Sequence, residues 1–243
     1  MDKNQFYHIF ADVFKKNNLQ IYVKDEIVEK FFLLTELMLQ TNTVMNITAL
    51  TTLEKIIPLH YADCVIPASY VKEGAAVLDV GCGGGFPILP LAIVRPDLHL
   101  TGLDSTEKKI RYVQSTANEL GLPIQTIHGR AEEIAHDWIH RETYDVVISR
   151  AVARLNMLNE LCLPFLKPGG TFWAMKGAAG KEEQTEAADG CPKLGGKMGP
   201  YIEYPLHLLD GSEQRTMICI DKIAHTPPTY PRSFGAIKKK PLS

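Results

Sequence analysis

The feature that most constrains this chain is an apolar run that ends in a cluster of glycines. The run covers residues 75–80, the glycines fall within residues 81–85, and a second apolar segment, Ile88–Val94, follows. This order predicts a strand, a tight turn and a helix, because glycine serves where the backbone needs a positive φ or approaches a ligand. Such a turn leaves backbone N–H groups open to the polar groups of a nucleoside or nucleotide.

The spacing of the glycines narrows the class of ligand. A dinucleotide-binding turn has Gly-x-Gly-x-x-Gly, and here Gly81 and Gly83 are followed by Phe86 where the last glycine should stand. This departure argues against a nicotinamide-dependent oxidoreductase. The pattern that is present, Asp79-x-Gly-x-Gly-Gly-Gly, is similar to the first motif of S-adenosylmethionine-dependent methyltransferases.

The rest of the chain alternates between strand-like and helix-like segments, which predicts an α/β fold with a doubly wound, Rossmann-like class I methyltransferase sheet. The expected strands are 75–80, 98–103, 124–128, 145–148 and 171–175, and the expected helices are 88–94, 106–120, 132–135 and 155–165. After one more helix and a loose loop through position 199, two strands (202–206 and 215–220) joined near Asp210 predict an antiparallel edge hairpin.

The first 70 residues read as helical. Apolar side chains recur at helical spacing near the N-terminus and again over 25–40. Thr51 and Glu54 have the spacing of a capping box, which predicts the start of a third helix, and Pro58 should kink this helix or mark its true start. We therefore divide the chain into an N-terminal helical cap (1–70), a cofactor-binding body (71–222) and a basic C-terminal tail (223–243).

Composition excludes several classes of protein. The five cysteines are odd in number and widely spaced, which fits neither a disulfide framework nor a Cys-x-x-Cys metal site. No apolar run approaches the roughly 20 residues of a membrane span, and the N-terminus has no signal-peptide core. We expect a cytoplasmic monomer that binds neither a membrane nor a metal.

Polar residues follow each expected strand, at the edge where open parallel sheets bind ligands. Asp104 lies 23 positions after Gly81 and could accept the ribose hydroxyls or cap the next helix. Asp79 could bind the methionine amine or brace the glycine turn, and Glu132 with the Ala131 backbone could hold the adenine edge or only favour a helix start. The candidate cofactor-binding residues are Asp79, Gly81, Gly83, Phe86, Asp104, Ala131, Glu132 and Arg150, where Phe86 is either a pocket wall or a core residue.

Cations gather at two places. Arg150 ends an apolar strand and Arg154 follows it, which favours a carboxylate or phosphate partner and makes both positioning candidates. The last 22 residues carry five cations and no acid, so the tail either binds a phosphate backbone or is only solvated. The cations that could bind such phosphates are Arg154, Lys176, Arg232, Lys238, Lys239 and Lys240.

Two further patterns are interpreted as structural. His136 and His140 have the spacing of a helical zinc site, but no third ligand is near and the segment precedes a strand, on the edge away from the site. Cys162 falls on an apolar helix face and is expected in the core rather than as a nucleophile.

Together these residues resemble the RsmG (GidB) family of bacterial ribosomal-RNA methyltransferases. The resemblance covers nearly the whole chain, with less of the pattern in 177–200 and after Arg232, and with Cys82 and Gly84 as departures within the turn. It is carried by segments of the cap, the glycine turn, the strand ends and the tail: Asn46-Ile47-Thr48-Ala49, His60-Tyr61-Ala62-Asp63, Asp79-Val80-Gly81-Cys82-Gly83-Gly84-Gly85-Phe86-Pro87, Leu103-Asp104-Ser105, Lys108-Lys109-Ile110, Gly129-Arg130-Ala131-Glu132, Ile148-Ser149-Arg150-Ala151-Val152-Ala153, Met175-Lys176-Gly177 and Tyr230-Pro231-Arg232.

The resemblance implies methyl transfer from S-adenosylmethionine to N7 of a guanine in the decoding-region loop of 16S rRNA, with S-adenosylhomocysteine as product and rRNA or the small subunit as partner. It places the cofactor on Gly81, Phe86, Ala131, Glu132 and Arg150. Guanine N7 is a bare acceptor, so no catalytic base is expected. His60 and Asp63 could line the site, but we favour their pairing with each other. The alternatives are a small-molecule methyltransferase and a non-catalytic nucleoside-binding module.

Overall fold

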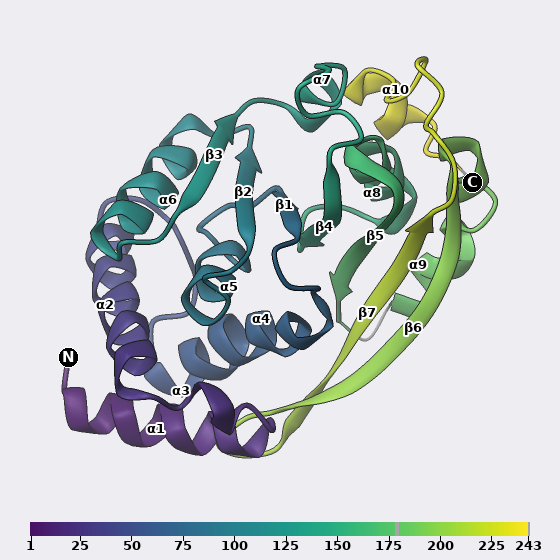
Figure 1. The fold of residues 1–243 in the computed structure, drawn as a ribbon. Coiled ribbons are helices and arrows are strands. Elements are labelled where there is room, and N and C mark those ends of the chain that lie inside the picture. The colour runs from purple at the N-terminus through teal and green to yellow at the C-terminus, as the bar shows by residue number, and fades with distance from the viewer. Residues whose placement is uncertain (178–179, 243) are drawn as a thin grey trace.

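A single seven-stranded sheet forms the centre of the molecule. The computed structural model describes residues 1–177 and 180–242, and the strand order is β3-β2-β1-β4-β5-β7-β6 (Figure 1). The first five strands along the chain run parallel, whereas β7 is antiparallel to β5 and β6 to β7. The strands are β1 (Ala76–Val80), β2 (His99–Asp104), β3 (Ile124–His128), β4 (Tyr144–Arg150), β5 (Leu166–Lys176), β6 (Gly196–His207) and β7 (Ser212–Lys222).

Helices cover both faces of this sheet, which confirms the predicted doubly wound α/β class. The α-helices are α1 (Lys3–Lys16), α2 (Asp25–Asn42), α3 (Leu53–Ile56), α4 (Asp63–Val65), α5 (Ile88–Val94), α6 (Glu107–Glu119), α7 (Ala131–Ile134), α8 (Leu155–Cys162), α9 (Gly180–Ala187) and α10 (Phe234–Lys239). Short 3₁₀ segments lie at Gln20–Tyr22, Ile66–Tyr70, Leu163–Phe165 and Cys191–Leu194, and Ile57–Ala62 is a π-helical turn.

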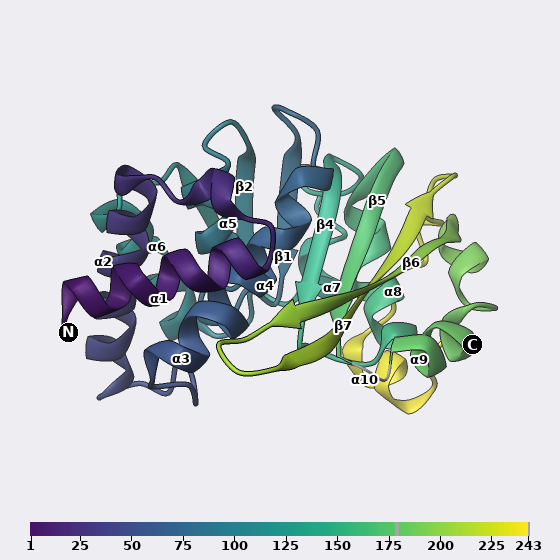
Figure 2. The same ribbon diagram turned by 90° about the horizontal axis from the view of Figure 1, so that it is seen from below.

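The two faces of the sheet belong to two separate cores because successive strand residues point to opposite sides. In β1, Val77 packs with the cap, α5 and α6, whereas Leu78 and Val80 pack with α8 and the C-terminal segment. Both faces are therefore apolar, as expected for parallel strands covered on both sides. The two chain termini lie at opposite ends of the molecule (Figure 2).

Aromatic side chains hold the N-terminal helices to the body. Phe10 stacks on Phe14 with ring centroids 3.8 Å apart, and both rings contact Phe31 of α2. Phe31 in turn packs against Tyr61, which is fully buried. The predicted helices at the N-terminus and over 25–40 are thus confirmed, because their apolar faces find one common core.

The predicted capping box is wrong. The N-cap of α3 is Thr52 rather than Thr51, and its side chain makes no capping hydrogen bond. Pro58 lies in the π-helical turn Ile57–Ala62 that continues α3, where its missing N–H is accommodated by the wider turn. This irregular turn carries His60 toward the sheet.

The edge hairpin is confirmed but is longer than predicted, since β6 begins at Gly196 where a loose loop was expected. Residues 178–179 belong to the predicted loose stretch, and residue 243 belongs to the predicted tail. These positions lie outside the described residues. The tip of the hairpin reaches the N-terminal helix (Figure 1), where the Asn17 amide exchanges two hydrogen bonds with the His207 backbone at 2.8 and 2.9 Å. The hairpin therefore links the sheet edge to α1.

Among the helices of the described residues, none combines the length and apolarity needed to cross a membrane.

Candidate functional site

A cavity lies at the carboxyl ends of β1, β2, β3 and β4, next to the point where the strand order reverses. Its volume is about 540 Å³, within the range that holds a nucleoside-sized ligand. Its walls come from the cap, the glycine turn, the strand ends and α10, and include Ile47, His60, Gly81, Gly83, Phe86, Asp104, Thr106, Lys109, Arg130, Ala131, Glu132, Arg150, Ala151, Val152, Leu161 and Phe234.

Glycine is required at two positions of the turn. Gly81 has φ +76°, and a Cβ there would lie 2.5 Å from a methyl group of Val152. Gly85 has φ +88°, and its Cβ would meet Leu89. The N–H groups of Gly81 and Cys82 both donate to the Leu103 carbonyl, at 2.8 and 3.0 Å, which ties the turn to β2. The turn is thus rigid before any ligand binds.

Asp104 connects the glycine turn to the start of α6. One carboxylate oxygen accepts from the N–H of Gly83 at 3.0 Å, and the other accepts from the N–H of Thr106 at 2.8 Å. Thr106 is the N-cap of α6 and makes no capping bond with its own side chain, so the helix-capping alternative is realised. Asp104 also lines the cavity, and each carboxylate oxygen has a second lone pair free for a ribose hydroxyl.

Asp79 is buried under the glycine turn and does not line the cavity. Neither of its carboxylate oxygens has a hydrogen-bond partner among the described residues. Burial raises the pKa of Asp79 to about 7, although the positive charge of Arg150 and the nearby backbone N–H of Ile88 oppose this shift. Without a hydrogen-bond partner the charged carboxylate is costly to bury, which accounts for the raised pKa of Asp79.

The wall at β3 is formed by a guanidinium, a carboxylate and an aromatic ring. Arg130 Nε donates to Glu132 Oε1 at 2.5 Å, and the Glu132 side chain is 8% exposed. The Arg130 guanidinium also lies over the ring of Phe234, 4.4 Å from its centroid. We call Arg130, Glu132 and Phe234 the tail wall. Glu132 stands in the first turn of α7, so the helix-start interpretation and the adenine interpretation are both compatible with its position.

The opposite wall also contains a guanidinium, a carboxyl group and an aromatic ring. His60 from the cap stacks on Phe86 with centroids 4.3 Å apart, and the Arg150 guanidinium lies 5.8 Å from the Phe86 centroid. Phe86 is 7% exposed and lines the cavity, so it is both a wall and a core residue. We call His60, Phe86 and Arg150, together with the buried Asp63, the cap wall.

Arg150 connects β4 to the cap. Its guanidinium donates to the Leu59 carbonyl at 2.9 Å, to His60 Nδ1 at 3.2 Å and to Asp63 Oδ2 at 3.3 Å. His60 and Asp63 therefore meet at Arg150, and the predicted direct pairing of the two is wrong, because the guanidinium lies within reach of both. Of these two residues, His60 lines the cavity and Asp63 does not.

The environment of His60 keeps its ring neutral. Burial and the neighbouring Arg150 charge lower the pKa of His60 to about 3. Since Nδ1 accepts from Arg150, Nε2 carries the hydrogen and donates to Thr48 Oγ1 at 2.7 Å. His60 thus joins the loop at Thr48 to the cavity wall.

Asp63 receives two groups from the edge hairpin as well. Tyr204 donates to Oδ1 at 3.3 Å, and Arg215 Nε lies 3.6 Å from the same oxygen. Burial raises the pKa of Asp63, while Arg150 and Arg215 oppose the shift. The cap, β4 and the hairpin are therefore held together at one buried carboxyl group.

The backbone after Arg150 has an unusual conformation. Ala151 has φ +58°, which a residue with a Cβ rarely adopts and which the surrounding structure must stabilise. It lines the cavity, and the next residue, Val152, is 43% exposed and covers Gly81. No sequence pattern indicated this strained segment.

Three of the predicted RNA-binding cations form ion pairs within the molecule. Arg154 binds Glu186 at 2.6 Å, Lys176 binds Glu183 at 2.8 Å with its own side chain 10% exposed, and Arg232 binds Glu160 at 2.6 Å. Lys222, one of the five cations in the last 22 residues, is buried and pairs with Glu142. By contrast, the last three candidates lie exposed at the end of the tail: Lys238, Lys239 and Lys240.

Several cavity residues were not identified from the sequence. Thr106 and Lys109 follow Asp104 closely, so their place after a strand end could have indicated them. Ile47, Leu161 and Phe234 come from a loop, a helix and the tail, and no local pattern relates them to the turn.

The residues interpreted as structural have structural contacts. Cys162 is fully buried, which raises the pKa of its thiol well above the usual value. His136 Nε2 contacts the Pro231 carbonyl at 2.9 Å and His140 Nδ1 contacts the Tyr144 hydroxyl at 3.1 Å, so the two rings have separate partners. Within residues 1–177 and 180–242, no three side chains are grouped as metal ligands.

Comparison with known proteins adds a family and a fold. The model of the family described as rRNA small subunit methyltransferase G matches residues 27–201. The ribosomal RNA small subunit methyltransferase G of Brevibacillus brevis is 39% identical over 245 residues and covers all of both chains. That of Alkaliphilus metalliredigens is 39% identical and covers 92% of this chain and 94% of its own.

Solved structures show the fold alone. A putative transferase from Pyrococcus horikoshii superposes with a TM-score of 0.53 at 14% identity, covering 66% of this chain and 62% of its own. The [4+2]-cyclase SpnF superposes with a TM-score of 0.52 at 14% identity, covering 67% of this chain and 82% of its own. These TM-scores agree with the α/β fold. The match to the family model and the identity to the two relatives show that this chain belongs to the rRNA small subunit methyltransferase G family.

Proposed function

We propose that this protein transfers a methyl group from S-adenosylmethionine to N7 of a guanine in 16S rRNA, within the decoding-region loop. The observation that carries the proposal is the cavity beside the glycine turn, at the reversal of strand order, in a chain of the rRNA small subunit methyltransferase G family. Such an enzyme would act in the bacterial cytoplasm on rRNA or on the small subunit.

Residues that line the cavity, together with the buried Asp79 beside it, fit this cofactor in three places. The unpartnered Asp79 carboxyl group under the turn suits the methionine ammonium, and Asp104 at the end of β2 suits the ribose hydroxyls. Ala131 and Glu132, after β3, suit the edge of the adenine. The order β3-β2-β1 spreads these groups along one direction, as an extended nucleoside with an amino-acid arm requires.

When bound, S-adenosylmethionine supplies a sulfonium methyl group that a nucleophile can displace. The acceptor N7 has a free lone pair, so the chain is not required to remove a proton. Consistent with this, His60 is held neutral between Arg150 and Thr48 and serves as a wall. The role left to the protein is positioning in a partly closed cavity, which can supply about 7–11 kcal/mol at best.

The RNA contacts follow from the exposed cations. Lys238, Lys239 and Lys240 lie exposed at the end of the tail and can reach phosphates, and Arg154 can exchange Glu186 for a phosphate at the surface. Lys176 and Arg232 keep buried or half-buried acids as partners, which favours a structural role for them.

The test is methyl transfer from labelled S-adenosylmethionine to small subunits and to 16S rRNA from a strain that lacks the gene. We expect one labelled guanine, located by cleavage at 7-methylguanine. An unlabelled rRNA alongside a labelled small metabolite in the same extract would overturn the proposal in favour of the small-molecule alternative. Binding of the cofactor without transfer to either substrate would favour the non-catalytic alternative.

A further inference from the structure

The C-terminal segment enters the cofactor cavity, although Phe234 lies 84 positions after Arg150, the last strand end that forms the cavity. Phe234, the first residue of α10, lines the cavity beside Arg130 and Glu132. Figure 1 shows α10 beside α7, the helix that begins with Ala131. We propose that Phe234 is a cofactor-binding residue that contacts the adenine base. This inference rests on the proposed function, because it assumes an adenine nucleoside in the cavity.

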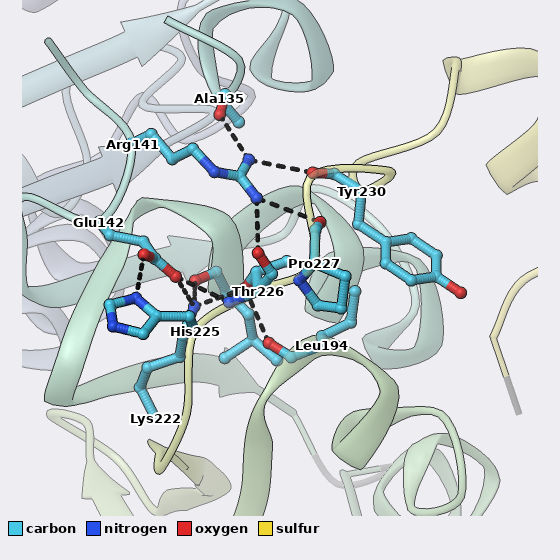
Figure 3. A network of polar contacts seen from close by, with 10 residues as sticks. Ala135, Arg141, Glu142, Leu194, Lys222, His225, Thr226, Pro227 and Tyr230 are labelled. Carbon is cyan, nitrogen blue, oxygen red and sulfur yellow. Dashed lines mark hydrogen bonds and ion pairs between the residues drawn. The ribbon is translucent and has the colours of Figure 1, made fainter. Parts of the chain in front are cut away.

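The segment before Phe234 is fastened to the body by a dense polar network (Figure 3). Arg141 donates to the carbonyls of Thr226, Pro227 and Tyr230 at 2.9 to 3.2 Å. Glu142 accepts from the Thr226 N–H at 2.7 Å and pairs with the buried Lys222. Most bonds of this network hold backbone or buried groups, with the exposed His225 as the exception, so the chain path toward the cavity is fixed.

Two anchors fix the ring itself. On one side, Arg232 forms a two-pronged pair with Glu160, at 2.6 and 2.8 Å, and its backbone N–H donates to the same carboxylate. On the other side, Ile237 is fully buried in the core under α8. Residues three apart share a helix face, so burial of Ile237 turns Phe234 toward the body.

Phe234 is nevertheless only half-buried, whereas Ile237 is fully buried in the core. Its ring is in contact with the Arg130 guanidinium and faces the part of the cavity where Ala131 and Glu132 follow β3. An aromatic ring held in place at the wall of a polar cavity is a surface on which a nucleobase can pack. The position at β3, two strands from the reversal point, corresponds to the base end of the ligand rather than to its methionine end.

The experiment measures binding of S-adenosylhomocysteine and of adenosine by calorimetry to the full-length wild type, Phe234→Ala, Phe234→Trp and Lys239→Ala. We expect Phe234→Ala to weaken both ligands by the same factor, about two- to tenfold. Phe234→Trp should restore the affinity because it keeps an aromatic surface. Lys239→Ala, on the same helix but outside the cavity wall, is the matched control and should bind as the wild type does.

Each other outcome has one meaning. Equal affinity of Phe234→Ala and the wild type overturns the inference, and so does a loss confined to S-adenosylhomocysteine, since adenosine carries the same base. Failure of the wild type to bind either ligand would instead refute the proposed cofactor. Thermal unfolding without ligand separates these effects from loss of structure: a Phe234→Trp variant that is as stable as the wild type but binds as weakly as Phe234→Ala also contradicts the proposal.

Discussion

Each of the two walls contains an arginine, a carboxyl group and an aromatic ring, but the two arginines differ in how firmly they are held. In the cap wall, the side chains of Arg150 and Asp63 are 17% and 6% exposed, and the hairpin adds two further groups to Asp63. In the tail wall, Arg130 is 43% exposed and has Glu132 as its ion-pair partner. The arginine is therefore held by more contacts in the cap wall than in the tail wall, where Arg130 contacts Glu132 and the ring of Phe234.

The difference matches what each end of the ligand requires. The reacting methyl group must be placed accurately, and accuracy demands side chains that are locked by several contacts. The base only needs to be held, and the wall there is completed by a segment from the far end of the chain. If this comparison is right, substitutions in the cap wall should cost more than those in the tail wall.

The largest effect is expected for Arg150→Ala. It removes three hydrogen bonds and leaves the buried Asp63 with Tyr204 at 3.3 Å and Arg215 at 3.6 Å. We expect urea unfolding to show a loss of about 3 kcal/mol in the free energy of unfolding, and methyl transfer to small subunits to fall by at least about 100-fold. Arg154→Ala, which removes an exposed arginine nearby, should leave stability unchanged; equal losses in the two variants would contradict the comparison.

Arg232→Ala should have the next largest effect. The variant strands the Glu160 carboxylate, which is fully buried, at a cost of about 2–3 kcal/mol. Because the anchor of α10 is lost, we also expect faster proteolysis after Thr226 while the body remains intact. Urea unfolding and a protease time course check this, with Lys239→Ala as the unaffected control. An unchanged unfolding midpoint would show that the tail wall is held elsewhere.

The substitution Asp79→Asn tests the buried carboxyl group that lacks a hydrogen-bond partner among the described residues. With its pKa raised from 3.8 to about 7, Asp79 binds a proton in the folded state where the unfolded chain has lost it. The free energy of unfolding of the wild type should therefore fall as the pH rises from about 4 to about 7 and then level off. Without ligand, the variant should be more stable than the wild type at pH 8 and about equal to it at pH 4.

The same variant should bind S-adenosylhomocysteine more weakly while its affinity for adenosine stays unchanged, because only the former carries the ammonium group. Parallel stability curves for the variant and the wild type between pH 4 and 8 would exclude a raised pKa at Asp79.

The smallest effect is expected for His60→Gln. The amide can accept from Arg150 and donate to Thr48, so it reproduces both contacts of the neutral imidazole. We expect cofactor affinity within about threefold of the wild type. The pH dependence of binding between pH 5 and 8 should coincide for the two proteins, since the pKa of His60 is about 3. A transition near pH 6.5 that only the wild type shows would mean that His60 is charged during binding.

Most of the fold could be predicted from the sequence, because the spacing of apolar residues and the positions of turn residues are local properties of the chain. Alternating apolar runs and the glycine turn located the parallel strands of the sheet and the helix Ile88–Val94. The failures were also local in origin. Thr51 and Glu54 had the right spacing, but the helix begins one residue later, and a stretch rich in glycine was interpreted as a loop where β6 begins.

The candidate site was predictable only in part. Residues that follow strands could be identified, since parallel strands end at one edge, and these include Gly81, Asp104 and Arg150. The partners of these residues could not. Arg150 binds a carboxyl group 87 positions away, and Arg130 lies against a ring 104 positions away. Nothing in the spacing of such residues specifies that they meet.

The sequence by itself thus determined the sheet, the glycine turn and the edge at which a nucleoside could bind, since each depends on residues that are near neighbours in the chain. The tertiary structure decided which charges are free and which are already paired, with Arg232 given to Glu160 and Asp79 left without a partner. It also brought His60 and Phe234 to opposite walls of one cavity. The physical reason is that pairing, burial and pKa depend on distances across the fold, which only the packing of the cap, the hairpin and the tail on the sheet sets.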